Sequence, residues 1–367
     1  MDAPPHTNSG IALPEIVLGN SNRRFSGITS TLLQVLPRQL SLMKIVVLGA
    51  HHLPQSAPYV GFFQLVKALR SRDAVDKTVV FHARRNNEMI QALVLKRLVR
   101  CQLKILFTST AQRYHTGFTL WLMHQMDSVI STCSAAAAYL PMQPDLLIPH
   151  GVDAERYRPP PIIDDSADYE TLSHRKHIGI FGRVRAQKGV DTLIAAALPL
   201  LKVHPDWDIV VVGEITPDQR DFVSKLKAQA AASGVLAQVT FIGKQSFDSL
   251  PALFRAMTIV TALSRNEGFG LTVLEAMSSG RPVIASRAGA WPDVIDSGVD
   301  GLLVEPGVAA ETRDALARLI ENEPLREQLS QAARQKIVDH YTVEREAERL
   351  ISHYQTLAST RMYNPST

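Results

Sequence analysis

Two glutamates eight residues apart, Glu267 and Glu275, lie in the segment with the clearest capacity for chemistry. Gly268 and Gly270 follow the first glutamate and leave the backbone free to approach a ligand closely. A short amphipathic helix is expected over 271–278, and the unpaired N–H groups at its N-terminus suit a phosphate. Both carboxylates would project into one site from different depths. The segment therefore predicts a phosphate-binding site flanked by two carboxylates.

A basic loop is the second candidate for phosphate binding. A strand predicted over 177–181 ends at Gly182, and Arg183 and Lys188 follow before Gly189 opens a helix. An arginine can grip phosphate oxygens through two N–H groups at once, and a lysine adds a compact point charge. A diphosphate would thus be held by two cations from this loop and by backbone amides from the two-glutamate segment.

Short apolar, β-branched runs alternate with longer helical patterns along the whole chain, which predicts an α/β fold of parallel sheets covered by helices. The predicted strands are residues 15–19, 44–48, 78–82, 104–108, 128–132, 177–181, 209–212, 239–242, 259–262, 282–285 and 301–304. Predicted helices of the first half cover 29–42, 62–71 and 87–100. An alternative places the first strand at 43–48. We prefer the earlier strand because Gly27 then opens an amphipathic helix, as a phosphate-facing loop should.

The alternation breaks at residues 154–176, where three consecutive prolines precede three aspartates in a composition typical of a linker. We therefore assign residues 1–155 and 156–340 to two Rossmann-like, doubly wound domains that face each other across a cleft, and residues 341–367 to a C-terminal helical segment. In such domains ligands bind at the carboxyl ends of the strands, where both phosphate-binding candidates are predicted to lie.

Charge is unevenly shared between the two halves. Residues 1–150 contain 15 Lys and Arg against 7 Asp and Glu, whereas the remainder contains 24 against 28. A basic first half suggests an anionic partner. Nucleic acid, an acidic membrane surface and an acidic substrate all fit this charge.

Other features narrow the classes of protein. Cys101 and Cys133 form neither a disulfide framework nor a zinc motif, and we expect buried, reduced thiols. Asp206 and Asp208 have the spacing of a metal-binding pair in other transferases, but they fall opposite the ligand-binding edge, so no metal site is assigned. The N-terminus lacks a signal-peptide pattern and no apolar run is long enough to span a bilayer, so we expect a cytoplasmic protein.

Together the motifs resemble the family 4 glycosyltransferases, the retaining enzymes of the GT-B fold, over nearly the whole chain after residue 15. The matching segments are 149–153, 181–183, 188–189, 267–275, 280–286 and 300–304. The resemblance implies that the first domain binds the acceptor, that the second binds the nucleotide-sugar donor, and that the final helix packs back toward the first domain.

The resemblance also implies roles for single residues. Arg183 and Lys188 would bind the donor diphosphate, Glu275 the ribose hydroxyls and Glu267 the transferred sugar. The rest of the donor loop comprises Gly268, Phe269, Gly270, Leu271 and Thr272. Gly27 resembles the remnant of the family's N-terminal glycine loop, of which a single glycine stands here. Asp293 replaces a frequent glutamate.

Residues 107–116 resemble the loop in which the family keeps a histidine near the transferred sugar. His115 would hydrogen-bond that sugar or the acceptor, and an ordinary surface histidine is the alternative. Residues 82–89 are similar to a sequence found in lipopolysaccharide core mannosyltransferases. The arginines expected in loops at strand ends, which suit an acceptor bearing carboxylates or phosphates, such as inner-core sugars on lipid A, are Arg23, Arg24, Arg84, Arg85 and Arg113.

The function that the resemblance implies is transfer of a hexose, with mannose preferred, from a nucleotide sugar to a lipopolysaccharide inner-core acceptor with retention of configuration. GDP-mannose is the preferred donor, with UDP-glucose and UDP-galactose behind it. Arg183, Lys188 and the helix amides would stabilise the leaving diphosphate in place of Mg²⁺, so we expect no metal and no further cofactor. We expect no nucleic-acid partner, and peripheral contact with the cytoplasmic face of the inner membrane.

Three alternatives remain open at this point. A sugar-nucleotide epimerase would need further acid and base groups, of which only His115 can be identified. A phosphorylase would use free phosphate in place of a nucleotide. A non-catalytic sugar-nucleotide binder would be expected to have lost some of the four charged donor-site residues, all of which are present.

Overall fold

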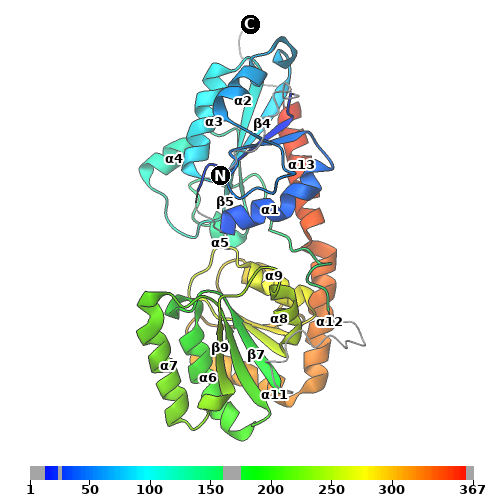
Figure 1. Ribbon diagram of the computed structural model, residues 1–367. Helices are drawn as coiled ribbons and strands as arrows, with labels where there is room; N and C mark the ends of the chain where they lie inside the picture. Colours follow the sequence, from blue (N-terminus) through cyan, green and yellow to red (C-terminus); the bar gives the residue numbers. More distant parts are fainter. Residues whose placement is uncertain (1–12, 24–26, 160–174, 361–367) are drawn as a thin grey trace.

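The computed structural model describes residues 13–23, 27–159 and 175–360, which form two α/β units stacked end to end (Figure 1). The first unit contains a parallel sheet in the order β3-β2-β1-β4-β5-β6. Its strands are β1 (Ile16–Gly19), β2 (Ile45–Leu48), β3 (Tyr59–Val60), β4 (Thr78–Ala83), β5 (Gln102–Ser109) and β6 (Ser128–Ser131). Both the early strand β1 and the strand at 45–48 are present, so the preferred prediction is confirmed.

Helices cover both faces of this first sheet. On one face, α2 (Phe62–Leu69), α3 (Asn86–Leu98) and α4 (Gly117–Met123) pack over an apolar core that includes Phe81 and Met89. On the opposite face lie α1 (Gly27–Leu40) and the last helix, α13 (Val343–Ser359). Figure 1 shows these two layers on opposite sides of the sheet. The short α5 (Ser134–Ala137) follows β6 at the junction with the second unit.

The second unit contains another six-stranded parallel sheet, in the order β12-β11-β10-β7-β8-β9. Its strands are β7 (Lys176–Phe181), β8 (Trp207–Val212), β9 (Val239–Gly243), β10 (Ile259–Ala262), β11 (Val283–Ser286) and β12 (Leu302–Val304). Its helices are α6 (Val190–Val203), α7 (Arg220–Ala232), α8 (Leu250–Ala256), α9 (Leu271–Ser278), α10 (Trp291–Val294), α11 (Ala309–Glu321) and α12 (Glu323–His340). Two doubly wound α/β units are therefore present, as predicted.

Within the described residues, eleven of the twelve strands coincide with predicted runs, and the exception is β3. It has only two residues, too few to produce the alternation by which a strand is recognised. The centre of the predicted linker, residues 160–174, and residues 24–26 lie outside the described part of the chain. Among the described helices, none is long and apolar enough to cross a membrane.

The chain passes between the units twice, and the two crossings lie side by side. The N–H of Val152 donates to the Tyr341 carbonyl at 2.9 Å, and the N–H of Val343 donates to the Val152 carbonyl at 3.1 Å. Gly151 permits this approach, because a Cβ there would lie 2.2 Å from the Thr342 carbonyl oxygen. Nearby, the Glu346 carboxylate accepts from the Gly151 N–H at 2.7 Å and is hydrogen-bonded to His150 Nδ1 at 2.8 Å.

Helix α13 is fixed to the first sheet by a buried polar chain as well as by apolar packing. The Tyr354 hydroxyl accepts from Gln39 Nε2 at 3.3 Å and is hydrogen-bonded to His82 Nδ1 at 2.7 Å. His82 Nε2 is hydrogen-bonded to the Thr108 hydroxyl at 2.6 Å. Burial lowers the pKa of His82 well below its ordinary value, with a further contribution from nearby Arg84, so the imidazole is neutral at physiological pH.

Replacing Tyr354 by Phe should destabilise the protein, because the ring still packs but His82 Nδ1 and the Gln39 amide lose a buried partner. An unsatisfied buried polar group costs about 1–3 kcal/mol, so the free energy of unfolding by urea should fall by that amount. Tyr139→Phe is the matched control, since the Tyr139 hydroxyl has no hydrogen bond to the described residues. Equal stabilities of the two variants would contradict the role given to this chain of hydrogen bonds.

Candidate functional site

The candidate site lies where the connectivity of the second sheet reverses direction. Strands β7 and β10 are neighbours, but the chain proceeds from β7 toward β8 and from β10 toward β11, on the other side. At such a point the loops after the two strands diverge and leave room for a ligand at their carboxyl ends. The basic loop follows β7 and the two-glutamate segment follows β10. The topology therefore brings together the two segments in which the sequence predicts phosphate binding.

The basic loop is held closely against the end of β10. Gly189 has φ of +75° and precedes α6, as predicted, and a Cβ on it would lie 2.1 Å from the Leu263 carbonyl oxygen. The next turn is clamped by Arg265, whose guanidinium donates to both carboxylate oxygens of Asp191 at 3.0 and 2.7 Å. Side chains projecting from this loop are therefore in a defined position relative to the two-glutamate segment.

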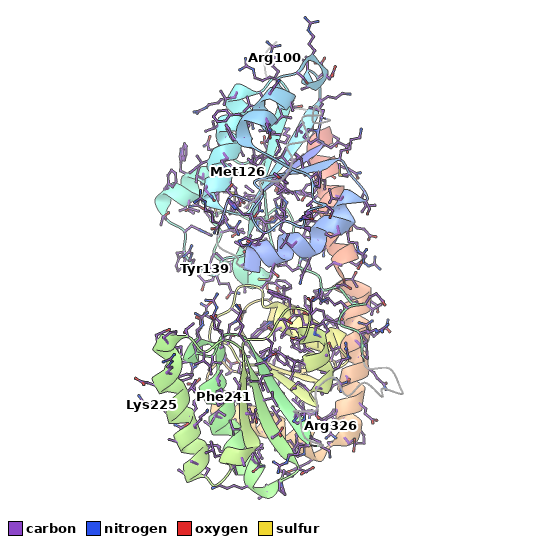
Figure 2. All side chains as sticks on the ribbon, in the orientation of Figure 1. Arg100, Met126, Tyr139, Lys225, Phe241 and Arg326 are labelled. Atoms are coloured by element: carbon purple, nitrogen blue, oxygen red, sulfur yellow. The ribbon has the colours of Figure 1, made fainter. Side chains whose placement is uncertain are left out.

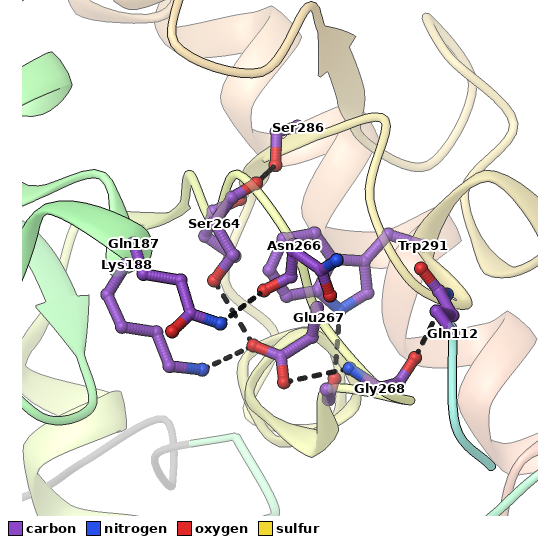
Figure 3. Close-up of polar contacts among 11 residues, drawn as sticks. Gln112, Gln187, Lys188, Ser264, Asn266, Glu267, Gly268, Ser286 and Trp291 are labelled. Atoms are coloured by element: carbon purple, nitrogen blue, oxygen red, sulfur yellow. Dashed lines mark hydrogen bonds and ion pairs between the residues drawn. The ribbon is translucent and has the colours of Figure 1, made fainter. Parts of the chain in front are cut away.

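Lys188 and Glu267 form an ion pair across the two segments (Figure 3). The same carboxylate accepts from the Ser264 hydroxyl at 3.1 Å and from the Gly268 N–H at 3.2 Å. The Ser264 carbonyl in turn accepts from the Ser286 hydroxyl at 2.6 Å, and this bond holds Ser264 in position. Both charged side chains are mostly buried, so the pair is shielded from solvent.

Helix α9 begins at Leu271 and ends at Ser278, the limits that the sequence predicts. Gly270 immediately precedes it with φ of +82°, and no side chain of the described residues caps the helix. The Gly270 carbonyl accepts from Trp291 Nε1 at 2.9 Å, which fixes the turn (Figure 3). The backbone N–H groups of Leu271 and Thr272 therefore begin a helix whose N-terminus can accept an anion.

Glu275 lies one turn further along α9 in a different environment. Its Oε1 accepts from the Tyr157 hydroxyl at 3.1 Å, and burial raises its pKa to about 7. Tyr157 is itself buried against Phe254, and this burial together with Glu275 raises the pKa of its phenol. The Glu267 and Glu275 carboxylates do not contact each other in the described structure. Glu275 is therefore held by a phenol in an apolar setting, whereas Glu267 is paired with Lys188.

The other predicted donor-site residues differ in their surroundings. Arg183 is exposed and makes no hydrogen bond or ion pair to the described residues, so its guanidinium is available. Phe269 is buried and contacts the His150 ring at 5.0 Å between centroids. Gly27 is the first residue of α1, and the loop immediately before it lies outside the described residues. The part of Gly27 in binding stays a prediction.

Loops of the first unit contact the second unit at the two-glutamate segment and at α10. Gln112 Nε2 donates to the Gly268 carbonyl at 3.3 Å, and the Ser134 N–H donates to the Asp293 carboxylate at 2.7 Å (Figure 3 for Gln112). His115 lies three residues after Gln112, is partly buried, and has an Nε2 without a partner among the described residues. Burial and nearby Arg113 lower its pKa, which favours the neutral ring at pH 7. The role of His115 stays a prediction.

The five loop arginines are not equally available. Arg85 donates to the buried Glu88 carboxylate at 2.9 Å and to the Thr29 hydroxyl at 3.1 Å, so it is committed to internal contacts. Arg84 has a buried Nη1 without a partner among the described residues. Arg23 and Arg113 are exposed, and Arg24 lies outside the described part of the chain. Of the five arginines predicted to bind the acceptor, Arg23, Arg84 and Arg113 therefore remain candidates within the described residues.

Asp206 and Asp208, which the sequence analysis excluded as a metal site, have partners in the structure. Asp208 is paired with buried His177, and Asp206 lies 3.7 Å from Lys176, both at the amino ends of β7 and β8. These aspartates are thus at the sheet edge opposite the candidate site. Cys101 and Cys133 are buried and free. Within residues 13–23, 27–159 and 175–360 there is no group of three or more His, Cys, Asp or Glu that could hold a metal ion.

Four contacts of the site could not be foreseen. The side chains of Ser264, Trp291, Gln112 and Tyr157 support Glu267, Gly270, the Gly268 carbonyl and Glu275. Gln112 lies within residues 107–116, the loop that the sequence analysis assigned to the site because of His115, so its position near the site was predictable although its contact was not. Tyr157 is 118 residues from its partner and carries no pattern of its own.

Comparison with known proteins identifies the family. Residues 164–336 match the family described as glycosyl transferases group 1. The chain is 39% identical over 344 residues to a lipopolysaccharide core biosynthesis mannosyltransferase, LpcC, of Rhizobium leguminosarum bv. viciae, covering 94% of this chain and 96% of that protein. The chain is a group 1 glycosyltransferase.

A second relative supports this assignment, and a solved structure shows the fold. The lipopolysaccharide core biosynthesis mannosyltransferase LpsB of Rhizobium meliloti is 37% identical over 349 residues, with 94% of this chain and 97% of that protein covered. A crystal structure of a glycosyltransferase from Rickettsia africae superposes with a TM-score of 0.79, covering 95% of this chain and all of that one at 15% identity. The latter shows that the fold of this glycosyltransferase is GT-B-like, as predicted.

Replacing Glu275 by Gln should change how stability depends on pH. The folded carboxyl has a pKa of about 7, whereas an unfolded one titrates near about 4.3. Between these values the folded state keeps a proton that the unfolded state has lost, so the free energy of unfolding falls as the pH rises. The variant lacks this fall. Its stability relative to the native protein should therefore increase by roughly 1–3 kcal/mol between about pH 4.5 and about pH 7.5.

Urea unfolding across this pH range measures the effect. Exposed Glu348 provides the control, since Glu348→Gln should leave the pH profile unchanged. Parallel profiles for native protein and Glu275→Gln would show that the carboxyl is not kept protonated by burial.

Proposed function

We propose that this glycosyltransferase transfers mannose from GDP-mannose to an anionic, lipid-linked inner-core saccharide of lipopolysaccharide, with retention of configuration and without a metal ion. The observation that carries the proposal is the Lys188–Glu267 ion pair beside the uncapped N-terminus of α9. The full-length similarity to two mannosyltransferases of lipopolysaccharide core biosynthesis supports the choice of sugar and acceptor.

The reaction separates charge, and the site has groups to stabilise it. Breaking the bond between the sugar and the diphosphate leaves negative charge on the diphosphate. In this proposal Lys188, exposed Arg183 and the N–H groups at the start of α9 surround that charge as it develops. These groups take the place that Mg²⁺ occupies in other transferases. The leaving phosphate accepts the proton of the acceptor hydroxyl on the same face of the sugar.

Lys188 is paired with Glu267 before the donor binds, and in this proposal donor binding changes the partners of both side chains. When phosphate oxygens approach, Lys188 is shared between them and Glu267, and the carboxylate becomes free to accept from sugar hydroxyls. In this proposal Glu275 accepts from ribose hydroxyls through Oε2, since Oε1 accepts from the Tyr157 hydroxyl. Gln112 fixes the Gly268 carbonyl from the first unit, so a closed arrangement of the two units aligns donor and acceptor.

The acceptor is assigned to the first unit on charge. The residues proposed to receive its carboxylates or phosphates are Arg84, Arg113 and Arg23, since Arg85 is committed to Glu88. His115 lies near Arg113, its Nε2 has no partner among the described residues, and in this proposal it contacts the sugar or the acceptor. An acceptor carried on a lipid requires the enzyme to work at the surface of a membrane. We place it at the cytoplasmic face of the inner membrane.

Lys188→Met should lower turnover by about a hundredfold or more, because removing one group that stabilises developing charge costs about 10²–10³ in kcat. Release of GDP from GDP-mannose in the presence of acceptor and EDTA measures it. Exposed Lys225 on α7, labelled in Figure 2, provides the control, and Lys225→Met should retain native turnover. Near-native turnover of Lys188→Met, or a strict requirement for Mg²⁺, would refute the proposed stabilisation of the diphosphate.

The nucleotide preference can be tested by thermal unfolding. A ligand that binds the native state alone raises the melting temperature in proportion to the logarithm of its concentration over its Kd. GDP-mannose and GDP should therefore raise the melting temperature more than UDP-glucose, UDP-galactose or UDP at equal concentration. A larger shift with the uridine nucleotides would assign the donor to that class instead.

A further inference from the structure

Phe269 lies between the two glycines of the two-glutamate segment, and its side chain packs against a residue from outside the second sheet. The ring of Phe269 meets the ring of His150 edge to face, with the centroids 5.0 Å apart and the planes at 75°. Both residues are buried, Phe269 being 6% exposed and His150 8% exposed. Because α9 begins two residues after Phe269, the imidazole is part of the support for the turn that leads into this helix.

The turn needs support from outside because it has little rigidity of its own. Gly268 and Gly270 flank Phe269, and a glycine loses more conformational freedom on ordering than any other residue. No side chain of the described residues caps α9. The positions of the Leu271 and Thr272 N–H groups, which are proposed to meet the donor diphosphate, therefore depend on contacts that neighbouring residues make.

His150 is fixed in turn by Glu346 at the start of α13. One carboxylate oxygen is 2.8 Å from His150 Nδ1, and the other accepts from the Gly151 N–H at 2.7 Å. A carboxylate only accepts, so Nδ1 carries the proton and the orientation of the imidazole is set. Glu346 is 6% exposed, and its helix packs on the first sheet. The first unit therefore determines, through two side chains, how Phe269 is supported.

We propose that His150, oriented by Glu346, is a positioning residue for the transfer reaction. It holds the turn before α9 in the geometry that binds the diphosphate and stabilises it as it leaves. Both side chains act through Phe269, and neither contacts the donor. Donor binding then depends on the packing of α13 on the first sheet, although the donor loop belongs to the second unit. The inference rests on the proposed site for the donor diphosphate, but not on the identity of the sugar or of the acceptor.

The alternative is that His150 and Glu346 only fasten the two crossings of the chain. The crossings are already joined through the backbone of Val152, which bonds to Tyr341 and Val343. A purely structural pair would contribute to the free energy of unfolding and leave the turnover of folded enzyme unchanged. A positioning pair changes turnover itself, because a displacement of about 1 Å at the reacting groups can lower the rate about a hundredfold.

Turnover of two variants tests the proposal. His150→Leu keeps an apolar side chain against Phe269 but loses the bond to Glu346, and kcat should fall about tenfold or more. Glu346→Gln is the milder change, because a single amide oxygen then faces two N–H donors, and kcat should fall about threefold or more. Release of GDP from GDP-mannose is measured at saturating donor and acceptor, well below the melting temperature of each variant, so that only folded enzyme is compared.

A double variant and a surface control show whether the two residues act together. Because Glu346 acts on turnover only by orienting His150, the double variant His150→Leu with Glu346→Gln should lower kcat no further than His150→Leu does. Glu344→Gln is the matched control on the same helix. Glu344 pairs with Arg38, both side chains are nearly half exposed, and the variant should retain native kcat.

Hydrogen exchange measured without donor separates this inference from the donor assignment. In His150→Leu, peptides covering residues 267–278 should exchange faster than in the native protein, while peptides covering α7 exchange equally. That result, from a native protein that shows no turnover with GDP-mannose, would refute the donor assignment and support the positioning role. Unchanged exchange over 267–278, native kcat in both single variants, or losses that multiply in the double variant would each overturn the proposal.

Discussion

The candidate site depends on the ion pair between Lys188 and Glu267, which joins two loops that the sheet topology sends in opposite directions. A mostly buried pair is stable only where further hydrogen bonds satisfy the charges, and removal of one partner leaves the other charge uncompensated. Ser264 and the Gly268 N–H provide those bonds to the carboxylate. The phosphorylated donor of the proposed function would therefore enter an arrangement that already holds a cation in position, so little reorganisation would be needed for it to bind.

The same loops are held by contacts that reach across the molecule. Gln112 and Ser134 from the first unit contact the segments after β10 and β11, and His150 packs its ring against Phe269. His150 is also hydrogen-bonded to Glu346 at the start of α13. Helix α13, which covers the first sheet, is thus linked through His150 to the two-glutamate segment of the second unit.

Much of the fold could be predicted from the sequence, because parallel strands buried on both faces are continuous apolar runs. The start of α9 could also be predicted, because a glycine, which adopts a positive φ readily, stands directly before a helical pattern. The Tyr157–Glu275 contact could not be predicted, because it joins residues far apart in sequence that show no shared periodicity. The ion pair between Arg85 and Glu88 could have been predicted, because the two residues are three apart at the start of a helix.

The uneven charge of the two halves has a structural explanation that the sequence totals conceal. In the second half, cations are balanced locally: Lys336 bonds to Asp296 and Asp300, each at 2.7 Å, and Arg265 to Asp191. In the first half, Glu88 and Asp127 are paired, whereas Lys67, Arg70 and Arg97 are exposed and have no ion pair among the described residues. Net charge alone fits nucleic acid, membrane or an acidic substrate equally well. Because exposed Arg113 follows Gln112, which contacts the Gly268 carbonyl, part of this charge lies close to the candidate site, where the proposed acidic acceptor would use it.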